Sequence, residues 1–279
     1  MLITLEELQE RLARRDCVVF DCRHDLVEPQ RGRAAYHAGH LPGAHFASVD
    51  NDLSGERTGR NGRHPLPEAI EFAAFLNRHG VTPATPIVAY DDAGGSYAAR
   101  LWWLARWIGL THVAVLDGGW KKWLAEGRPV TTEAPAQPNH GCVVAQPAGR
   151  MVQTAADVLA ATRERTCLVV DARAPERFRG EVEPIDRVGG HIPTAVNRCY
   201  RDNLNPDQTL RPAEDLRREF KALLGNWKPA DVVHQCGSGI TACVNLLAME
   251  VAGLVGSRLY PGSWSEWSSD PSRPIARGA

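Results

Sequence analysis

One cysteine stands in a setting that suits nucleophilic chemistry. Cys236 follows the apolar run Val232–Gln235, which is typical of a buried strand, and precedes a helical pattern that begins near Thr241. In a parallel α/β sheet this position lies at the carboxyl edge, where ligands bind. Loop N–H groups and a helix N-terminus can both point at one sulfur atom there and favour its ionised form. The pattern predicts a thiolate nucleophile at Cys236.

The residues after the cysteine support this interpretation. Gly237 and Gly239 remove side chains that would block close approach to the sulfur, and Ser238 and Thr241 add hydroxyl donors. The alternative is that Cys236 is an ordinary buried thiol, since free cysteine often behaves as a small hydrophobic residue. Five other cysteines lack such a loop, and we interpret them as structural: Cys17, Cys142, Cys167, Cys199 and Cys243.

Cysteine-dependent phosphatases also hold a thiolate in a loop before a helix. Their motif requires an arginine after five intervening residues, and Ala242 stands at that position. The guanidinium that would grip a phosphoryl group is therefore missing, which disfavours this class of enzyme.

An internal repeat predicts the elements that position the loop. Four short patterns recur in the same order in the second half of the chain, at offsets that fall from 151 to 144 residues. They are a capped helix start (4–7 and 154–157), an apolar strand ending in Asp-x-Arg (18–23 and 168–173), Gly-His-Leu/Ile-Pro (39–44 and 190–195), and Gly-x-Trp-x-x-Trp (117–123 and 261–267). At the offset of 144, Asp92 stands opposite Cys236.

The repeat also predicts the domain organisation. Residues 128–150 carry four prolines and little periodicity, which is typical of a linker. We place the boundary near residue 145, giving domains 1–145 and 146–279. In each half short apolar runs alternate with helical patterns, which predicts an α/β fold with a parallel sheet covered by helices on both faces.

Composition limits the classes of partner. The 279 residues carry 32 Lys and Arg against 33 Asp and Glu, so no broad positive field exists for nucleic acid or an anionic membrane. The longest apolar stretch, 101–110, is too short to span a bilayer. No secretory signal is visible at the start, and the seven cysteines are irregularly spaced, as in reduced proteins. We expect a cytoplasmic protein.

Together, the duplicated halves, the Gly-His-Leu/Ile-Pro segments, the closing tryptophan motif and the Cys236 loop resemble the two-domain rhodanese-like sulfurtransferases. The loop is similar to the Cys-Gly-Ser-Gly-Val-Thr version of the 3-mercaptopyruvate branch, with Ile240 in place of valine. The resemblance implies two tandem rhodanese-like domains, the first catalytically silent with Asp92 in the cysteine position. It also implies that Gly237, Gly239, Ile240 and Thr241 line the substrate.

The reaction implied by this resemblance is sulfur transfer. Cys236 would take a sulfur atom from a small-molecule donor as a persulfide and pass it to cyanide or to an acceptor thiol, such as a dithiol protein or glutathione. The thiolate attacks the donor sulfur, and loop N–H groups stabilise the persulfide anion. This chemistry needs no metal and no organic cofactor. A thiosulfate:cyanide sulfurtransferase and a non-catalytic binding module remain alternatives.

The charge of the loop bears on the donor. Thiosulfate-type members of the family carry a basic residue in this loop, where the present chain has Gly237 and Ser238. A neutral loop favours a donor with less charge, such as 3-mercaptopyruvate, whose carboxylate an arginine fork can bind. Arg177 matches the family's first substrate arginine. The second lies in a segment that is two residues shorter here, so either Arg187 takes the role or the role is vacant, with Arg179 as a further fallback.

The resemblance also implies a polar set around the loop serine. Its members match Ser238, His64 and Asp50 in this chain. A histidine oriented by a carboxylate could polarise Ser238 against the donor carbonyl and relay a proton as pyruvate leaves. In the alternative interpretation, His64 caps the helix that follows Pro67 and Asp50 is a turn residue.

Overall fold

The computed structural model describes residues 1–137 and 139–278, which form two compact units. The N-terminal unit comprises Met1–Gly55, Pro67–Ala148 and the short segment Asn205–Leu210. The C-terminal unit comprises Glu56–Leu66, Gly149–Leu204 and the chain from Arg211 onward. The main division after Ala148 lies in the proline-containing linker, but residues 56–66 of the first half belong to the C-terminal unit. In the described part of the chain, no helix is long and apolar enough to cross a membrane.

The N-terminal unit contains a five-stranded parallel sheet in the order β1-β5-β4-β2-β3. Its elements are β1 (Leu2–Ile3), α1 (Leu5–Arg14), β2 (Val18–Asp21), α2 (Gln30–Ala38), β3 (His45–Phe46), α3 (Ala69–Arg78), β4 (Ile87–Tyr90), α4 (Ala98–Trp107), β5 (Val113–Leu116) and α5 (Gly119–Ala125).

The C-terminal unit contains a four-stranded parallel sheet in the order β7-β6-β8-β9. Its elements are η1 (Gly149–Met151), α6 (Ala155–Glu164), β6 (Leu168–Asp171), α7 (Pro175–Arg179), β7 (Val196–Asn197), η2 (Tyr200–Asn203), α8 (Ala213–Leu224), η3 (Pro229–Asp231), β8 (Val232–Gln235), α9 (Ala242–Val251), β9 (Arg258–Leu259) and α10 (Ser263–Trp267).

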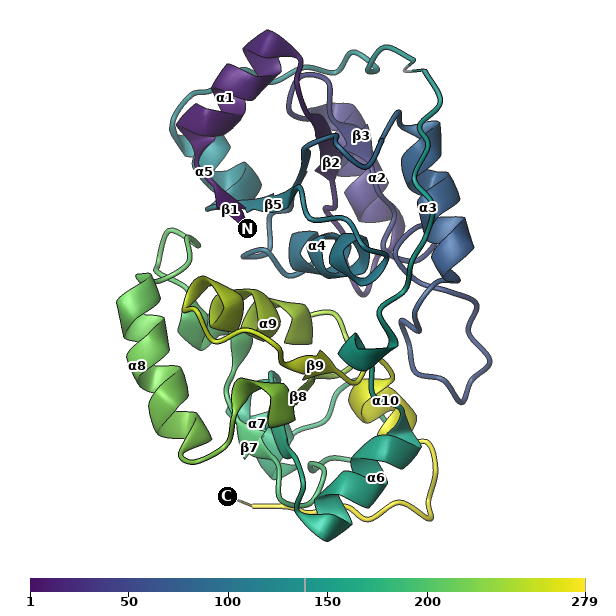
Figure 1. The fold of residues 1–279 in the computed structure, drawn as a ribbon, viewed down its shortest axis with the longest axis vertical. Helices are drawn as coiled ribbons and strands as arrows, with labels where there is room; N and C mark the ends of the chain where they lie inside the picture. The colour runs from purple at the N-terminus through teal and green to yellow at the C-terminus, as the bar shows by residue number, and fades with distance from the viewer. Residues whose placement is uncertain (138, 279) are drawn as a thin grey trace. The chain divides into compact units, whose positions relative to one another are not determined.

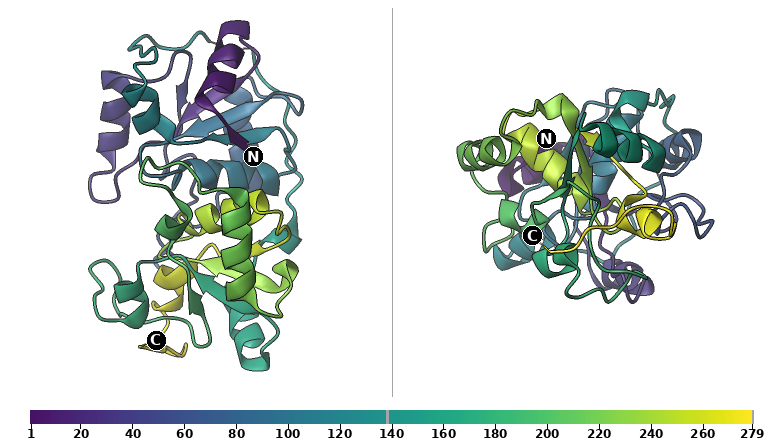
Figure 2. Two further views of the ribbon diagram at one scale, coloured as in Figure 1. Left: turned by 90° about the vertical axis from the view of Figure 1, so that its left-hand side faces the viewer. Right: turned by 90° about the horizontal axis from the view of Figure 1, so that it is seen from below.

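Helices cover both faces of each sheet. Successive strand residues point to opposite faces and therefore pack against different helices. In the N-terminal unit, Val19 of β2 packs in a cluster with α1 and α5, whereas the ring of Phe20 packs against Phe75 of α3. In the C-terminal unit, Val233 of β8 packs with α6 and α10, whereas His234 contacts Met249 of α9. Helix α8 lies beside α9, as Figures 1 and 2 both show. The expected α/β class with parallel, doubly covered sheets is confirmed.

A buried ion pair recurs in the two units and accounts for part of the repeat. In the C-terminal unit, Arg173 forms a fork with Asp171 at the end of β6 and donates to the carbonyl of Gly190 at 2.6 Å. Asp21 and Arg23 make the same contacts with the carbonyl of Gly39. Charge-assisted bonds in a buried setting are among the stronger polar contacts. The pair therefore ties each strand end to the following Gly-His-x-Pro segment.

Candidate active site

The cysteine loop begins directly after β8 and ends where α9 starts. Cys236 is only 2% exposed, its N–H donates to the Ser263 hydroxyl at 3.1 Å, and its carbonyl accepts the N–H of Trp264 at 3.0 Å. Helix α10 therefore anchors the first residue of the loop through both backbone groups. Gly239 has φ +77, and a Cβ there would collide with the carbonyl oxygen of Pro261, so only glycine suits this position.

The corresponding loop of the N-terminal unit corrects the expected alignment. Strand register pairs Val19 with Val88 and Val169 with Val233, so β4 and β8 match at an offset of 145 residues. Asp91, rather than Asp92, therefore stands in the position of Cys236. The sequence alignment failed here because the N-terminal loop, residues 91–97, is one residue longer than the loop at 236–241.

The Asp91 carboxylate fills the cradle formed by its own loop. Its two oxygens accept four backbone N–H groups at 2.7 to 2.9 Å, from Ala93, Gly95, Tyr97 and Ala98. Burial raises the pKa of Asp91 above its ordinary value of 3.8, although the four N–H groups lower it. A strand–loop–helix connection of this type can thus surround one anionic group with amide hydrogens.

Ser238 and His64 come together in the C-terminal unit. The Nδ1 atom of His64 lies 2.7 Å from the Ser238 hydroxyl, and both residues are buried. The segment 56–66 carries His64 to the loop, although it precedes the loop by 174 residues. Asp50 lies in a turn after β3 in the N-terminal unit, and its part in this set stays a prediction.

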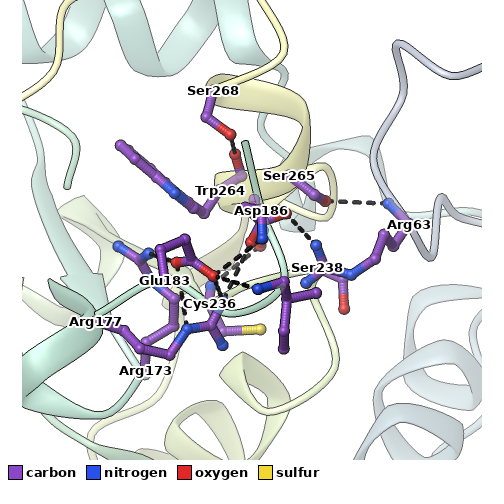
Figure 3. Close-up of polar contacts among 12 residues, drawn as sticks. Arg63, Arg173, Arg177, Glu183, Asp186, Cys236, Ser238, Trp264, Ser265 and Ser268 are labelled. Atoms are coloured by element: carbon purple, nitrogen blue, oxygen red, sulfur yellow. Dashed lines mark hydrogen bonds and ion pairs between the residues drawn. The ribbon is translucent and has the colours of Figure 1, made fainter. Parts of the chain in front are cut away.

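A network of alternating charges lies beside the cysteine loop (Figure 3). Arg177, in the middle of α7, forms a fork with Glu183 at 2.7 and 3.3 Å. Its Nη2 atom also donates to Asp186 at 3.2 Å. Burial raises the pKa of Asp186 above 3.8, although Arg63 lowers it. Burial opposes ionisation of Glu183 as well, but hydrogen bonds from Arg177 and two backbone N–H groups bring its pKa below 4.5.

Arg63 is a residue of this network that the sequence interpretation missed. Its Nη1 atom donates to Asp186 from the side opposite Arg177, and its backbone N–H donates to the Ser265 hydroxyl at 3.0 Å (Figure 3). The only signal in the sequence was its position directly before His64. Arg187, by contrast, is exposed.

The remaining residues of the loop have mainly structural surroundings. Ile240 is buried, and Thr241 is the residue before the first turn of α9. The Cys243 thiol donates to the carbonyl of Gly239 at 3.4 Å and so supports the loop from within the helix.

All seven cysteines are free thiols. Burial raises the pKa of Cys17 to about 11 and also raises the pKa values of Cys22, Cys167 and Cys199. These four thiols stay protonated near neutral pH, which suits the structural roles expected for Cys17, Cys167 and Cys199 and extends them to Cys22.

Comparisons with known proteins match both halves of the chain. The model of the rhodanese-like domain matches residues 4–126 and 154–270. The chain is 45% identical over 280 residues to a probable 3-mercaptopyruvate sulfurtransferase of Pseudomonas aeruginosa, covering 99% of this chain and 98% of that protein. It is 40% identical to a putative thiosulfate sulfurtransferase of Mycobacterium tuberculosis, covering 100% of this chain and 97% of that protein.

Solved structures give the same result for the fold. A 3-mercaptopyruvate sulfurtransferase of Leishmania major matches with a TM-score of 0.84 at 29% identity, covering 96% of this chain and 74% of that one. A structure of the 3-mercaptopyruvate enzyme of Escherichia coli matches with a TM-score of 0.80 at 29% identity, covering 95% of this chain and 99% of that one. The likeness extends over both units.

Proposed function

Since the chain belongs to the family of proteins built from rhodanese-like domains, we propose that it is a sulfurtransferase that moves a sulfur atom from 3-mercaptopyruvate through a persulfide on Cys236. The acceptor is a thiol, such as a dithiol protein or glutathione, or cyanide. Relatives named for this activity cover almost the whole chain. The observation that carries the assignment to Cys236 is its position at the start of a loop whose counterpart surrounds the Asp91 carboxylate with four N–H groups.

The proposed first step transfers sulfur to the enzyme. The Cys236 thiolate attacks the sulfur of 3-mercaptopyruvate, and an S–S bond forms while the C–S bond breaks. The electron pair of the broken bond passes to carbon, giving the enolate of pyruvate. That carbon takes up the proton that the donor thiol carried, and pyruvate leaves. The loop N–H groups of residues 237–242 stabilise the remaining persulfide anion, as their counterparts stabilise Asp91.

Ser238 assists the same step in this proposal. Its hydroxyl, held by His64 at 2.7 Å, donates to the donor carbonyl oxygen as negative charge develops there, and Asp50 orients His64. Arg177 binds the donor carboxylate, and Gly237, Gly239, Ile240 and Thr241 line the donor.

The second step regenerates the enzyme. An acceptor thiolate or cyanide attacks the outer sulfur of the persulfide, the S–S bond breaks, and its electron pair returns to Cys236 as thiolate. The N-terminal domain supplies no nucleophile, because Asp91 occupies the position that corresponds to Cys236. We place the activity in the cytoplasm, since seven free thiols suit a reducing compartment.

Mass spectrometry of the intact protein tests the persulfide. After incubation with 3-mercaptopyruvate and removal of the donor, we expect a gain of one sulfur atom. The gain disappears on reduction and is absent in Cys236→Ser, whose turnover falls by at least ~10³-fold because a hydroxyl is a far weaker nucleophile than a thiolate.

Cys142→Ser is the matched control, because Cys142 is an exposed thiol, and it should still gain the sulfur. A gain that persists in Cys236→Ser would contradict the assignment. The absence of any gain with either 3-mercaptopyruvate or thiosulfate would favour a non-catalytic binding module. A larger kcat/KM with thiosulfate than with 3-mercaptopyruvate would favour the thiosulfate activity named for the mycobacterial relative.

A further inference from the structure

The Gly-x-Trp-x-x-Trp motif recurs in both units, but its second residue differs. That residue is Gly119 in the N-terminal unit and Ser263 in the C-terminal unit. Both have a left-handed backbone conformation, with φ +53 and φ +54. Glycine adopts this conformation without strain, whereas a side chain makes it costly. The C-terminal unit therefore carries a strained residue where the N-terminal unit has none, and such strain points to a function.

The surroundings of the two residues differ accordingly. A Cβ on Gly119 would lie 2.4 Å from the carbonyl oxygen of Asp91, so the N-terminal unit has no room for a side chain there. Ser263 is completely buried, and its hydroxyl accepts the N–H of Cys236 at 3.1 Å. The same hydroxyl donates to the carbonyl of Tyr260 at 2.9 Å. It thus connects the proposed nucleophile to the segment that precedes α10.

The backbone of α10 makes two further contacts with the cysteine loop. The N–H of Trp264 donates to the Cys236 carbonyl at 3.0 Å, and the N–H of Ser265 donates to the Gly237 carbonyl at 2.9 Å. In a trans peptide the N–H points away from the carbonyl of the same unit. These bonds therefore turn the N–H groups of Gly237 and Ser238 away from α10. The helix helps to set the direction of the N–H groups that act on the sulfur in the proposed reaction.

Helix α10 is itself firmly anchored. The side chains of Trp264 and Trp267 are completely buried. Their indole N–H groups donate to the carbonyls of Val188 and Pro274 at 2.8 and 2.9 Å. The guanidinium of Arg173 stacks over the Trp264 ring at 4.6 Å. A helix held at both tryptophans is a rigid support for the loop beside it.

The Asp91 loop has less need of such support. Its carboxylate accepts four N–H groups and so orders the loop from within. Helix α5 adds the N–H of Trp120, which donates to the Asp91 carbonyl at 2.8 Å. A thiol is a weak hydrogen-bond acceptor. The loop of Cys236 therefore cannot be ordered in the same way before its sulfur is charged.

We propose that Ser263 is a positioning residue for Cys236, whose hydroxyl fixes the first N–H of the loop so that the following N–H groups face the sulfur before charge develops on it. The inference rests on the proposed function, because it concerns the nucleophile of that reaction. In this role Ser263 acts through the loop and not through contact with the donor. N–H groups that are already in place stabilise an anion without any reorganisation at the moment of reaction.

Two substitutions separate the hydroxyl from the backbone strain. Ser263→Ala removes the hydroxyl and keeps the strain, whereas Ser263→Gly removes both. In both variants we expect kcat with 3-mercaptopyruvate to fall roughly tenfold or more while KM changes by less than about twofold, because the nucleophile is misplaced and the donor contacts remain. Ser263→Gly should melt several degrees above Ser263→Ala, since the strain is relieved. If Ser263→Ala does not fold, Ser263→Gly alone gives the comparison with the wild type.

Ser268→Ala is the matched control. Ser268 follows α10 directly and is buried, and its hydroxyl donates to the Trp264 carbonyl at 2.7 Å (Figure 3). The substitution removes a buried hydroxyl from the same helix end without touching a hydrogen bond of the loop. Its kcat should equal that of the wild type, even if its melting temperature falls.

Alkylation of Cys236 by iodoacetamide tests the same role without a sulfur donor. The rate near neutral pH, followed on the peptide that contains Cys236, should fall about tenfold in both Ser263 variants, because a sulfur without oriented N–H donors is less often ionised. The rate in Ser268→Ala should match that of the wild type.

Three outcomes would overturn the inference: an unchanged kcat in Ser263→Gly, a kcat that recovers with stability from Ser263→Ala to Ser263→Gly, or a rise of KM larger than the fall of kcat. The last would place Ser263 at the donor. The proposed function fails separately. If the wild type gains no sulfur from any donor but its alkylation depends on Ser263, the positioning role stands and the sulfur-transfer assignment is wrong.

Discussion

The loops that follow β4 and β8 share one backbone plan and differ in the group at their first residue. Both begin directly after the strand and end at a helix, and in both the first carbonyl accepts the N–H of a tryptophan, Trp120 for Asp91 and Trp264 for Cys236. In the first loop a carboxylate engages four N–H groups permanently. In the second the same position holds a thiol. One loop architecture can therefore stabilise the fold, when its N–H groups bind a carboxylate of the loop itself, or serve chemistry, when its first residue is a nucleophile.

Asp91 in the N-terminal unit and Asp186 in the C-terminal unit are held by different kinds of partner. Asp91 is 2% exposed and bonded to backbone N–H groups, which cannot move without unfolding the loop. Asp186 is bonded to two arginine side chains and lies in a turn with exposed neighbours. The first carboxylate is therefore a fixed part of the structure, and we expect the second to exchange with a ligand.

Removal of the fixed carboxylate should have the largest effect on stability. Asp91→Ala leaves four buried N–H donors without their acceptor, which we expect to lower the free energy of unfolding by about 3 kcal/mol. Cys236→Ala removes one buried sulfur atom and should lower it by only about 1 kcal/mol. Chemical denaturation of the two variants and of the wild type measures the difference.

The activity of these two variants should follow the opposite order. The fraction of Asp91→Ala that remains folded should still take up sulfur, whereas Cys236→Ala should not. If the two variants proved equally stable, or if Asp91→Ala lost sulfur uptake while still folded, the contrast between a structural and a chemical loop would be wrong.

A methyl group added at Gly237 tests whether the arginine beside the cysteine contributes to donor binding. Gly237 does not have a positive φ, so alanine suits its backbone, but the added methyl group would lie 2.8 Å from Arg63 Nη2. We expect Gly237→Ala to push this guanidinium aside and to raise KM for 3-mercaptopyruvate about tenfold, since a charged hydrogen bond to the donor is lost.

A double-mutant cycle makes this test specific. Adding Gly237→Ala to Arg63→Gln should change KM little, because both substitutions remove the same contact. Gly149→Ala is the control, since a Cβ there meets no atom within 4 Å. Full additivity of the two substitutions would show that Gly237 acts independently of Arg63.

The smallest expected effect on KM is that of removing the charge of Asp186. Asp186→Asn removes the charge that competes with the donor, so KM should fall about threefold. Because the pKa of Asp186 is raised above 3.8, its carboxylate becomes neutral as the pH falls through that raised value, and the two arginines are released. The KM of the wild type should therefore decrease toward acid pH.

In Asp186→Asn this pH dependence should be weaker, because the titrating group is gone. Glu183 also faces Arg177, but its lowered pKa keeps it ionised over the same range. A KM that rises in Asp186→Asn would instead mean that Asp186 positions the arginines and is not displaced.

The sequence predicted what depends on residues that are close along the chain. The strand–loop–helix at Cys236, the alternation of strands and helices and the order of the repeat are all local patterns, and the structure confirms them. The predicted alignment of Asp92 with Cys236 was wrong, and Asp91 takes that position. A one-residue difference in loop length becomes visible only when the strands are paired. The Asp171–Arg173 pair was visible only as part of the repeat, and its burial was not predicted, since charged residues are usually exposed.

What the sequence by itself determined is therefore the fold class, the repeated architecture and the residue proposed as nucleophile. Only the tertiary structure decided which side chains surround that residue. It brought Arg63 to Gly237 across more than half of the chain and left Arg187 at the surface, whereas the pairing of His64 with Ser238 was already implied by the family resemblance. The physical reason is that a loop's conformation follows from its own residues, whereas the charges beside it arrive on other segments whose packing no local pattern records.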